Sequence, residues 1–257
     1  MSAFDPLHAA AAFAAAFLAG LINSVAGGGT LVTFPTLIWL GLNSVTANAT
    51  STVAIWPGTL GSAWGYRREL QTVERRLFWL LVPSIIGGLA GAWLLRFTPP
   101  AVFDRLIPYL ILFATLLFMA QEPVQRWMKS ADAAKHHSAG WLAGALAFQL
   151  GVALYGGYFG AGIGILMLAA LSVIGLTDMH QMNSLKVLLG GTMNGVAIVY
   201  FVAHKMVFWP DVVLMALGAI AGGYGGAGMA RRVGGGVVRR LVIIIGFALA
   251  LSFFLRH

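Results

Sequence analysis

The feature that most constrains this chain is a series of long apolar runs separated by short clusters of charge. The runs cover roughly residues 7–26, 29–42, 47–65, 77–95, 103–120, 139–157, 160–175, 182–203, 209–229 and 241–255. An apolar helix needs roughly 18–20 residues to cross a bilayer, so the pattern predicts an all-α polytopic membrane protein with about 8–10 membrane segments. Only 9% of the 257 residues are charged, whereas a soluble domain carries about 25%.

The charge and cysteine counts narrow the function classes. A net charge of +8 would suggest nucleic-acid binding in a soluble protein. Here the basic residues are explained as cytoplasmic loop anchors, so the expected partner is the lipid bilayer and not a nucleic acid. The absence of cysteine removes thiolate metal sites, iron–sulfur clusters and cysteine nucleophiles. We therefore expect no metal, no cofactor, no catalytic residue and no enzyme activity.

An internal repeat accounts for the order of the runs. At an offset of 134 residues, Gly28, Leu37, Gly41, Leu42, Val53, Gly61, Ala63 and Tyr66 meet Gly162, Leu171, Gly175, Leu176, Val187, Gly195, Ala197 and Tyr200. One residue further on, Arg96 and Arg105 meet Arg231 and Arg240. Recurrent small residues also occur in any helical membrane protein, but the repeated order favours a duplication. The prediction is a first repeat at 1–121, a cytoplasmic linker loop at 122–138 and a second repeat at 139–257.

Two glycine clusters interrupt the runs, one at 27–29 and one at 160–164. The runs on either side of a cluster are open to three interpretations: one long kinked helix, two short spans or a re-entrant hairpin. If 139–175 folds back, 11 basic residues lie on the cytoplasmic side and 4 outside, as the positive-inside rule requires. Five segments per repeat then make the two repeats inverted. Inverted repeats with broken helices are typical of secondary transporters whose site lies at the bilayer midplane.

Polar residues gather at the two glycine clusters and in the segment that follows each. A glycine cluster can expose backbone N–H groups at the start of a half-helix, where the helix dipole favours an anion. Helix packing is the alternative role for each glycine, and Asn43, Ser44 and Asp178 are read as helix caps. The predicted substrate-binding residues are Asn23, Ser24, Gly27, Gly28, Gly29, Thr30, Thr50, Ser51, Tyr158, Gly160, Gly162, Gly164, Asn183, Ser184 and Lys186.

Lys186 is the most informative of these residues, because it lies inside an apolar segment. An unpaired ammonium there costs at least about 2.5 kcal/mol, unless the side chain snorkels to the interface. The eight acidic residues, Asp211 among them, all lie in loops or at segment ends, so the expected partner of Lys186 is a small anionic substrate. His180 and Lys186 are the candidates for proton coupling. The remaining histidines, including His8, are expected to be solvated.

The motifs around the glycine clusters resemble those of the TauE/SafE family, also called the toluene sulfonate uptake permease family. In the first half, Gly-Gly-Gly-Thr is followed by Pro35, Gly41 and Asn48-Ala-Thr50-Ser51, and in the second half Gly160-Ala-Gly162-Ile-Gly164 and Asn183-Ser-Leu-Lys186 fit the same pattern. The similarity extends from about Gly20 to Leu255.

The resemblance implies a multi-pass protein of the bacterial inner membrane that exports sulfite or an organosulfonate such as sulfoacetate. The residues themselves are equally compatible with a passive anion channel, or with a transporter of another small organic anion. Two further glycine-rich stretches, 87–91 and 222–228, are interpreted as helix-packing faces. They serve either within one chain or across a homodimer.

Overall fold

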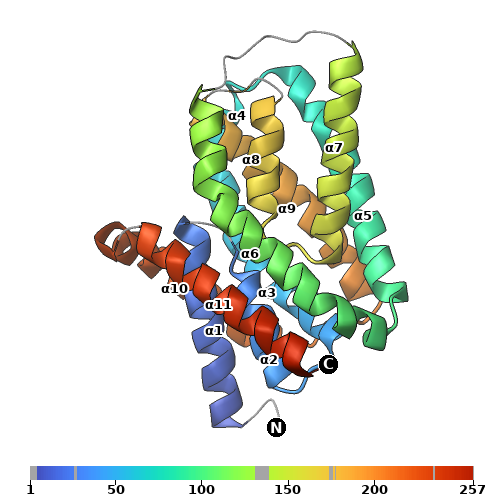
Figure 1. Ribbon diagram of the computed structural model, residues 1–257, viewed down its shortest axis with the longest axis vertical. Coiled ribbons are helices and arrows are strands. Elements are labelled where there is room, and N and C mark those ends of the chain that lie inside the picture. The colour runs from blue at the N-terminus through green and yellow to red at the C-terminus, as the bar shows by residue number, and fades with distance from the viewer. Residues whose placement is uncertain are drawn as a thin grey trace.

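The chain is described by a computed structural model that covers residues 5–25, 28–130, 139–173, 176, 178–233 and 235–256 (Figure 1). Helix is the only regular secondary structure over these residues, which confirms the all-α prediction. The elements are α1 (Pro6–Val25), α2 (Thr30–Trp39), α3 (Ser44–Gly65), α4 (Arg67–Leu70), the 3-10 helix η1 (Arg75–Leu80), α5 (Leu81–Phe97), α6 (Pro100–Ser130), α7 (Ala139–Tyr158), α8 (Ile163–Val173), α9 (Met179–Ala203), α10 (Trp209–Val233) and α11 (Gly235–Arg256).

Several of these helices have the length and hydropathy of membrane spans. Over the described residues, four stretches meet both criteria, namely Pro6–Asn23, Arg75–Phe97, Pro100–Ala120 and His180–Ala203. Large apolar side chains point outward from the bundle, for example Ile86, Leu217 and Leu251, each more than half exposed. Exposed apolar surface of this extent marks a membrane-facing protein. The chain is therefore a multi-pass membrane protein.

The two short helices that follow the glycine clusters fold back on their predecessors. α2 has 10 residues and α8 has 11, so at 1.5 Å per residue each is about 15 Å long, half of the roughly 30 Å hydrocarbon core. α1 packs on α2 and α7 packs on α8. In Figure 1, α8 runs back upward beside the descending α7. Of the three interpretations left open by the sequence, these contacts exclude one long kinked helix, while the re-entrant hairpin and the two short spans both stay predictions.

Helix contacts recur in matched couples that follow the predicted repeat. The offset pairs α1 with α7, α3 with α9, α5 with α10 and α6 with α11. Accordingly, α1 packs on α10 as α7 packs on α5, and α3 packs on α10 as α9 packs on α5. In Figure 1, α1 rises from the N-terminal end whereas α7 descends from the opposite end. These couples agree with a duplication, and the inverted relation of the two halves stays a prediction.

The two additional glycine-rich stretches pack inside a single chain. A Cβ on Gly222 of α10 would collide with the carbonyl oxygen of Phe17 on α1. Equivalently, a Cβ on Gly91 of α5 would collide with the carbonyl oxygen of Leu154 on α7. Glycine is required at both positions because the backbones approach too closely for any side chain. Among the described residues of these stretches, the glycines thus serve contacts within one chain.

The predicted linker loop is partly wrong, because α6 continues to Ser130. The sequence from Gln121 onward is polar, which suggested a loop. However, glutamine, glutamate, arginine, methionine and lysine are good helix formers. The helix therefore continues beyond its apolar part into the polar sequence. The rest of the linker, residues 131–138, lies outside the described residues.

Candidate functional site

The helix breaks are built from glycines whose backbone angles suit few other residues. Gly28 has a φ of +111°, Gly160 a φ of +80° and Gly162 a φ of +78°. These values lie in the left-handed region, where a side chain is disfavoured. The first cluster separates α1 from α2 and the second separates α7 from α8. Both predicted helix breaks are thereby confirmed.

Both breaks lie against the same turn of α6. A Cβ on Gly28 would overlap the ring of Phe118. A Cβ on Gly162 would lie 3.2 Å from Cδ1 of Leu117 and 3.6 Å from the Cα of Ala114. Because Ala114 and Phe118 are one helical turn apart, α6 brings the two breaks together at one place in the bundle.

Further contacts join the second break to α2 and α3. The rings of Phe34 on α2 and Phe159 in the break meet edge to face with centroids 5.4 Å apart. Asn48 on α3 donates through Nδ2 to the carbonyl oxygen of Tyr158 at 2.9 Å, and its Oδ1 is buried without a hydrogen-bond partner among the described residues. The hydroxyl of Tyr158 donates to Oγ1 of Thr98 at 3.3 Å. The phenol group thus serves a contact with the end of α5.

The first break is held by side chains predicted to bind substrate. The Oδ1 atom of Asn23 accepts the N–H of Gly29 at 2.8 Å, and Thr30 is buried at the start of α2. Thr33, on the next turn, donates through Oγ1 to the carbonyl oxygen of Gly29 at 3.2 Å and lies 2.6 Å from Oγ of Ser51. Ser51 is therefore the donor in that pair. Asn23 and Ser51 fix the geometry of the break from α1 and α3.

Lys186 lies beside the second break. Its Nζ donates to Oδ1 of Asn183 at 2.8 Å, and its Cδ lies 3.4 Å from where a Cβ on Gly164 would be. Gly164 is in the first turn of α8, so the lysine stem runs along the N-terminus of that half-helix. In the part of the chain that the structure describes, no carboxylate forms an ion pair with Lys186. Its hydrogen-bond partner is a neutral amide oxygen.

Three other predicted residues lie away from the breaks, and two of them bond to the backbone of other residues. Thr50 is fully buried and accepts the N–H of Phe208, ahead of α10, at 3.0 Å. Ser184 donates to the carbonyl oxygen of Gln181 at 2.8 Å. His180 is exposed at the start of α9.

Two predicted positions cannot be placed in the same way. Gly27 lies outside the described residues, as does the side chain of Ser24. Of the three helix caps predicted beside the site, Asn43 and Asp178 are confirmed. The prediction for Ser44 is wrong, because Ser44 is the first residue inside α3 and its Oγ is buried without a hydrogen-bond partner among the described residues. Asn43 accepts the N–H of Thr46 at 2.9 Å, and Asp178 accepts that of His180 at 2.8 Å.

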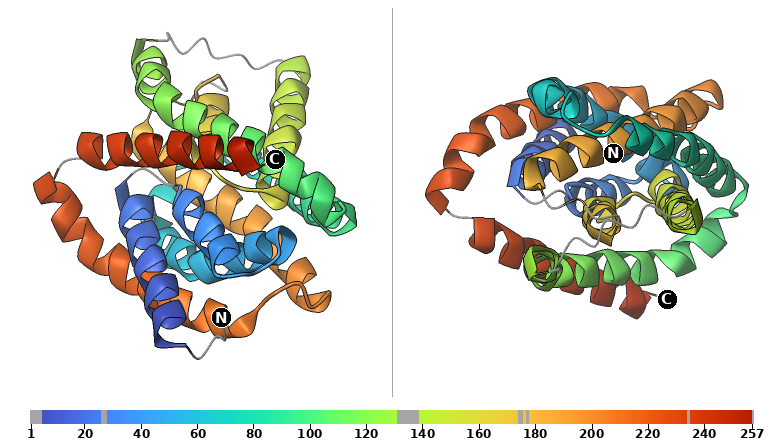
Figure 2. Two further views of the ribbon diagram at one scale, coloured as in Figure 1. Left: turned by 60° about the horizontal axis from the view of Figure 1, so that its bottom comes forward. Right: turned by 90° about the horizontal axis from the view of Figure 1, so that it is seen from above.

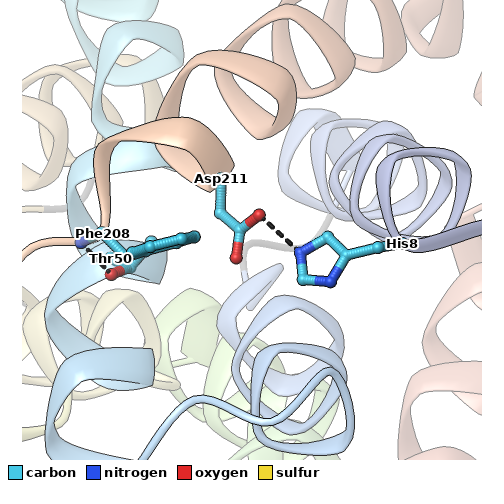
Figure 3. A network of polar contacts seen from close by, with 4 residues as sticks. All are labelled: His8, Thr50, Phe208 and Asp211. Carbon is cyan, nitrogen blue, oxygen red and sulfur yellow. Dashed lines mark hydrogen bonds and ion pairs between the residues drawn. The ribbon is translucent and has the colours of Figure 1, made fainter. Parts of the chain in front are cut away.

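Sequence reasoning was wrong about His8 and Asp211. Both were placed at solvated segment ends, but His8 is 2% exposed and Asp211 is fully buried. His8 Nε2 lies 2.7 Å from Asp211 Oδ1 (Figure 3). Each residue sits in the first turn of an apolar helix, where a polar side chain is usually solvated. The tight packing of α1 on α10 removes that solvent, and only the tertiary contact reveals the pair.

The apolar helices define a membrane protein, and the comparisons with known proteins give its class as a membrane transporter. Three bacterial relatives share this class by name. They are "Probable membrane transporter protein" of Haemophilus influenzae, 27% identical and covering 91% of this chain and 90% of the relative, "Probable membrane transporter protein ORF9" of Sinorhizobium sp, 27% identical and covering 93% and 89%, and "Probable membrane transporter protein YfcA" of Escherichia coli, 25% identical and covering 94% and 87%.

The family model described as "Sulfite exporter TauE/SafE" matches residues 12–253. This chain belongs to the TauE/SafE family. No solved structure matches it. The family and its bacterial relatives agree with a multi-pass protein of the bacterial inner membrane.

Proposed function

We propose that this protein is a secondary transporter that exports a small sulfur oxyanion, sulfite or an organosulfonate such as sulfoacetate. The observation that carries the proposal is the position of Lys186. Its Cδ lies 3.4 Å from where a Cβ on Gly164, in the first turn of α8, would be. Its ammonium bonds a neutral amide, beside a glycine break that shares a turn of α6 with the other break. The arrangement offers positive charge without a protein carboxylate to neutralise it among the described residues.

The chemistry of this place suits an oxyanion. The first N–H groups of a helix have no partner within the helix and carry the positive end of its dipole. They therefore bind an anion readily, as hydrogen-bond donors. A lysine adds a full positive charge with three donors, of which Asn183 takes one. A sulfonate or sulfite head presents three acceptor oxygens, and bonds from charged donors to such oxygens are the strong ones.

The family supports the substrate class and direction, since its model is described as a sulfite exporter. The relatives carry only the broader name of membrane transporter. In our proposal the anion is moved without chemical change. Residues around the two breaks bind it, while Thr50 and Ser184 keep structural roles.

Alternating access is supported by the matched helix couples. α1 of the first half packs on α10 of the second, and α7 of the second packs on α5 of the first. In transporters built from inverted repeats, one repeat rocks against the other around a fixed site, and such interfaces join the two halves here. In our proposal, these two interfaces open in turn around the anion held at the breaks.

Thermal stabilisation of the purified protein tests the anion site. Sulfite, sulfoacetate, thiosulfate and acetate are titrated against the wild-type protein and Lys186→Met in detergent. A ligand at 100 times its Kd stabilises a protein by about 2.7 kcal/mol, and we expect this gain for a sulfur oxyanion and its loss in the variant. Lys205→Met is the matched control, because Lys205 is an exposed lysine after α9. Equal stabilisation of all three proteins would contradict the site.

Counterflow in liposomes distinguishes a transporter from a passive anion channel. A channel has a continuous pore, so with the membrane voltage held at zero, unlabelled sulfite inside the vesicle does not drive labelled sulfite inward against its gradient. We expect wild-type protein to show this trans-stimulated accumulation. A simple collapse of the sulfite gradient without it would identify a channel.

A further inference from the structure

The buried pair of His8 and Asp211 lies apart from the glycine breaks. We propose that this pair is the proton-binding site that couples the transporter to a proton gradient, an inference that rests on the proposed transport function. It replaces His180 in that role, because His180 is exposed at the start of α9, whereas His8 and Asp211 are almost completely removed from solvent.

The pair is not explained as a device for stability. Removing two charges from water costs several kcal/mol per ion, and apolar replacements are often as stable. Moreover, His8 Nδ1 and Asp211 Oδ2 are buried without hydrogen-bond partners among the described residues. A pair kept for stability alone would be expected to satisfy these atoms. Ionisable groups buried in membrane helices typically mark ion or proton pathways.

The repeat gives a second argument. At an offset of 134 residues, the position of His8 corresponds to Leu142, and at 135 that of Asp211 corresponds to Arg76. The equivalent couple of α7 with η1 and α5 therefore packs without an acid and a histidine at these positions. The fold does not need the pair to bring the two helices together.

Protonation of this pair changes the charge buried between α1 and α10. With one proton on the imidazole nitrogen that faces Asp211 and none on Nδ1, His8 is neutral and the carboxylate leaves one buried negative charge. A second proton, taken up at Nδ1, makes the imidazolium and brings the pair to zero net charge. Proton release therefore leaves an uncompensated charge in the interface, which favours separation of α1 from α10.

Other charged groups near this interface are few. Over the sequence of α2 and α3, both packed on α1, there is no titratable residue. α11 also packs on both helices, and its only charged residues are arginines, which stay protonated. These are Arg239, Arg240 and Arg256. Two further charged residues, Asp5 and Lys205, precede the starts of α1 and α10. The other titratable residues of α10 lie at least about 20 Å further along that helix, namely Tyr224, Arg231 and Arg232. In this neighbourhood, the change of charge falls to His8 and Asp211.

A chain of contacts connects the pair to the first break. In Figure 3, Asp211 lies between His8 and the contact of Thr50 with Phe208. That contact, at 3.0 Å, anchors the start of α10 on α3. The residue after Thr50, Ser51, bonds Thr33, which in turn bonds the carbonyl oxygen of Gly29. A movement of α10 away from α1 is thus transmitted through α3 to the start of α2.

Two variants separate a proton site from a structural pair. His8→Gln with Asp211→Asn removes both charges and retains a hydrogen bond. His8→Lys retains the ion pair, but a lysine ordinarily holds its proton up to about pH 10. If the pair is only structural, His8→Lys preserves its function. If the pair is a proton site, His8→Lys abolishes its function, because the lysine does not release the proton. The second variant therefore keeps the test decisive if the first one does not fold.

The first measurement needs no substrate. The chain has no cysteine, so spin labels can be attached through Leu18→Cys on α1 and Leu217→Cys on α10, both exposed positions. They report the distance between these helices from about pH 5.5 to 8.5. We expect the distance to grow with pH in the otherwise wild-type chain and to stay constant in both variants. No response to pH in the wild-type chain, or an unchanged response in the variants, would overturn the proposal.

The second measurement follows protons and sulfite together in proteoliposomes that contain a pH-sensitive dye. We expect a sulfite gradient to drive proton movement in the wild-type protein. In both variants this proton movement falls to that of protein-free vesicles, while exchange of labelled for unlabelled sulfite continues. Proton movement that persists in the variants would overturn the coupling site and leave the proposed function intact. If sulfite neither binds nor exchanges in any protein, the proposed function fails, and the spin-label response decides on the proton site.

Discussion

The interface of α1 with α10 and that of α5 with α7 are built alike and differ in one buried polar pair. In both, glycines let the backbones approach to direct contact. The first contains His8 and Asp211, which can exchange a proton. The second contains Ser84 and Gln149, with Gln149 Nε2 donating to Ser84 Oγ at 2.8 Å, and this pair stays neutral at any physiological pH. Close packing of these helices therefore requires glycine and not charge.

The two interfaces share the close packing of backbones at glycines, but only one of them contains an ionisable pair. All four polar residues are at most 2% exposed, so burial does not distinguish them. What distinguishes them is whether the interface can change its net charge (Figure 2 shows both couples from two further directions). In our proposal, the two interfaces move alike, and sensitivity to protons lies only at the interface of α1 with α10.

The largest expected effect comes from removing one member of the charged pair. His8→Ala leaves Asp211 buried without its partner, which costs about 3–5 kcal/mol of unfolding free energy. Thermal or chemical unfolding in detergent near neutral pH measures the loss. The double variant His8→Ala with Asp211→Ala should lose less than the single one, because no charge stays behind. Equal losses would show that the two residues do not interact.

An intermediate effect is expected from filling the glycine contacts. Gly222→Ala and Gly91→Ala each place a methyl group against a backbone carbonyl of the facing helix. Overpacking of this kind costs about 1–3 kcal/mol, and equivalent interfaces should lose similar amounts. Gly144→Ala on α7 is the control, since no atom lies within 4 Å of the place that its methyl group would occupy. If only one of the two interfaces loses stability, they are not mechanical equivalents.

The smallest effect is expected from the neutral pair. Replacing both partners by apolar residues, Ser84→Ala with Gln149→Leu, should change the unfolding free energy by about 1 kcal/mol or less, because a hydrogen bond removed with both partners is nearly neutral. Stability should also keep the pH dependence of the wild-type protein. A loss as large as that of His8→Ala would mean that every polar pair in these interfaces is structural.

Most of the fold could be predicted because it follows from local patterns. The apolar runs indicated the helices, and the glycine clusters indicated the breaks, since both depend on the composition of a continuous stretch. That α2 and α8 fold back on α1 and α7 needed the structure, because a short apolar run fits several arrangements. The end of α6 was misplaced for a different reason: polarity marks the edge of the membrane, while helix propensity continues beyond it to Ser130.

The candidate site could be predicted only where a residue is unusual in its own segment. Lys186 was conspicuous as a cation in an apolar run, and the structure places it against Gly164. Thr50 was included because of its neighbours along the chain, but its partner is Phe208, which only the tertiary structure reveals. The same holds for His8 and Asp211, which are 203 positions apart and look like ordinary helix starts.

The brevity of α2 and α8 also has an electrical consequence. Each spans about half of the hydrocarbon core, and the breaks from which they start meet on α6. In our proposal, an anion held there reaches either aqueous side in a short step, across which the membrane voltage falls steeply. An inside-negative voltage supplies about 2.3 kcal/mol per elementary charge per 100 mV. Outward movement of an anion is driven by this voltage, and an inward proton adds to the same electrical work.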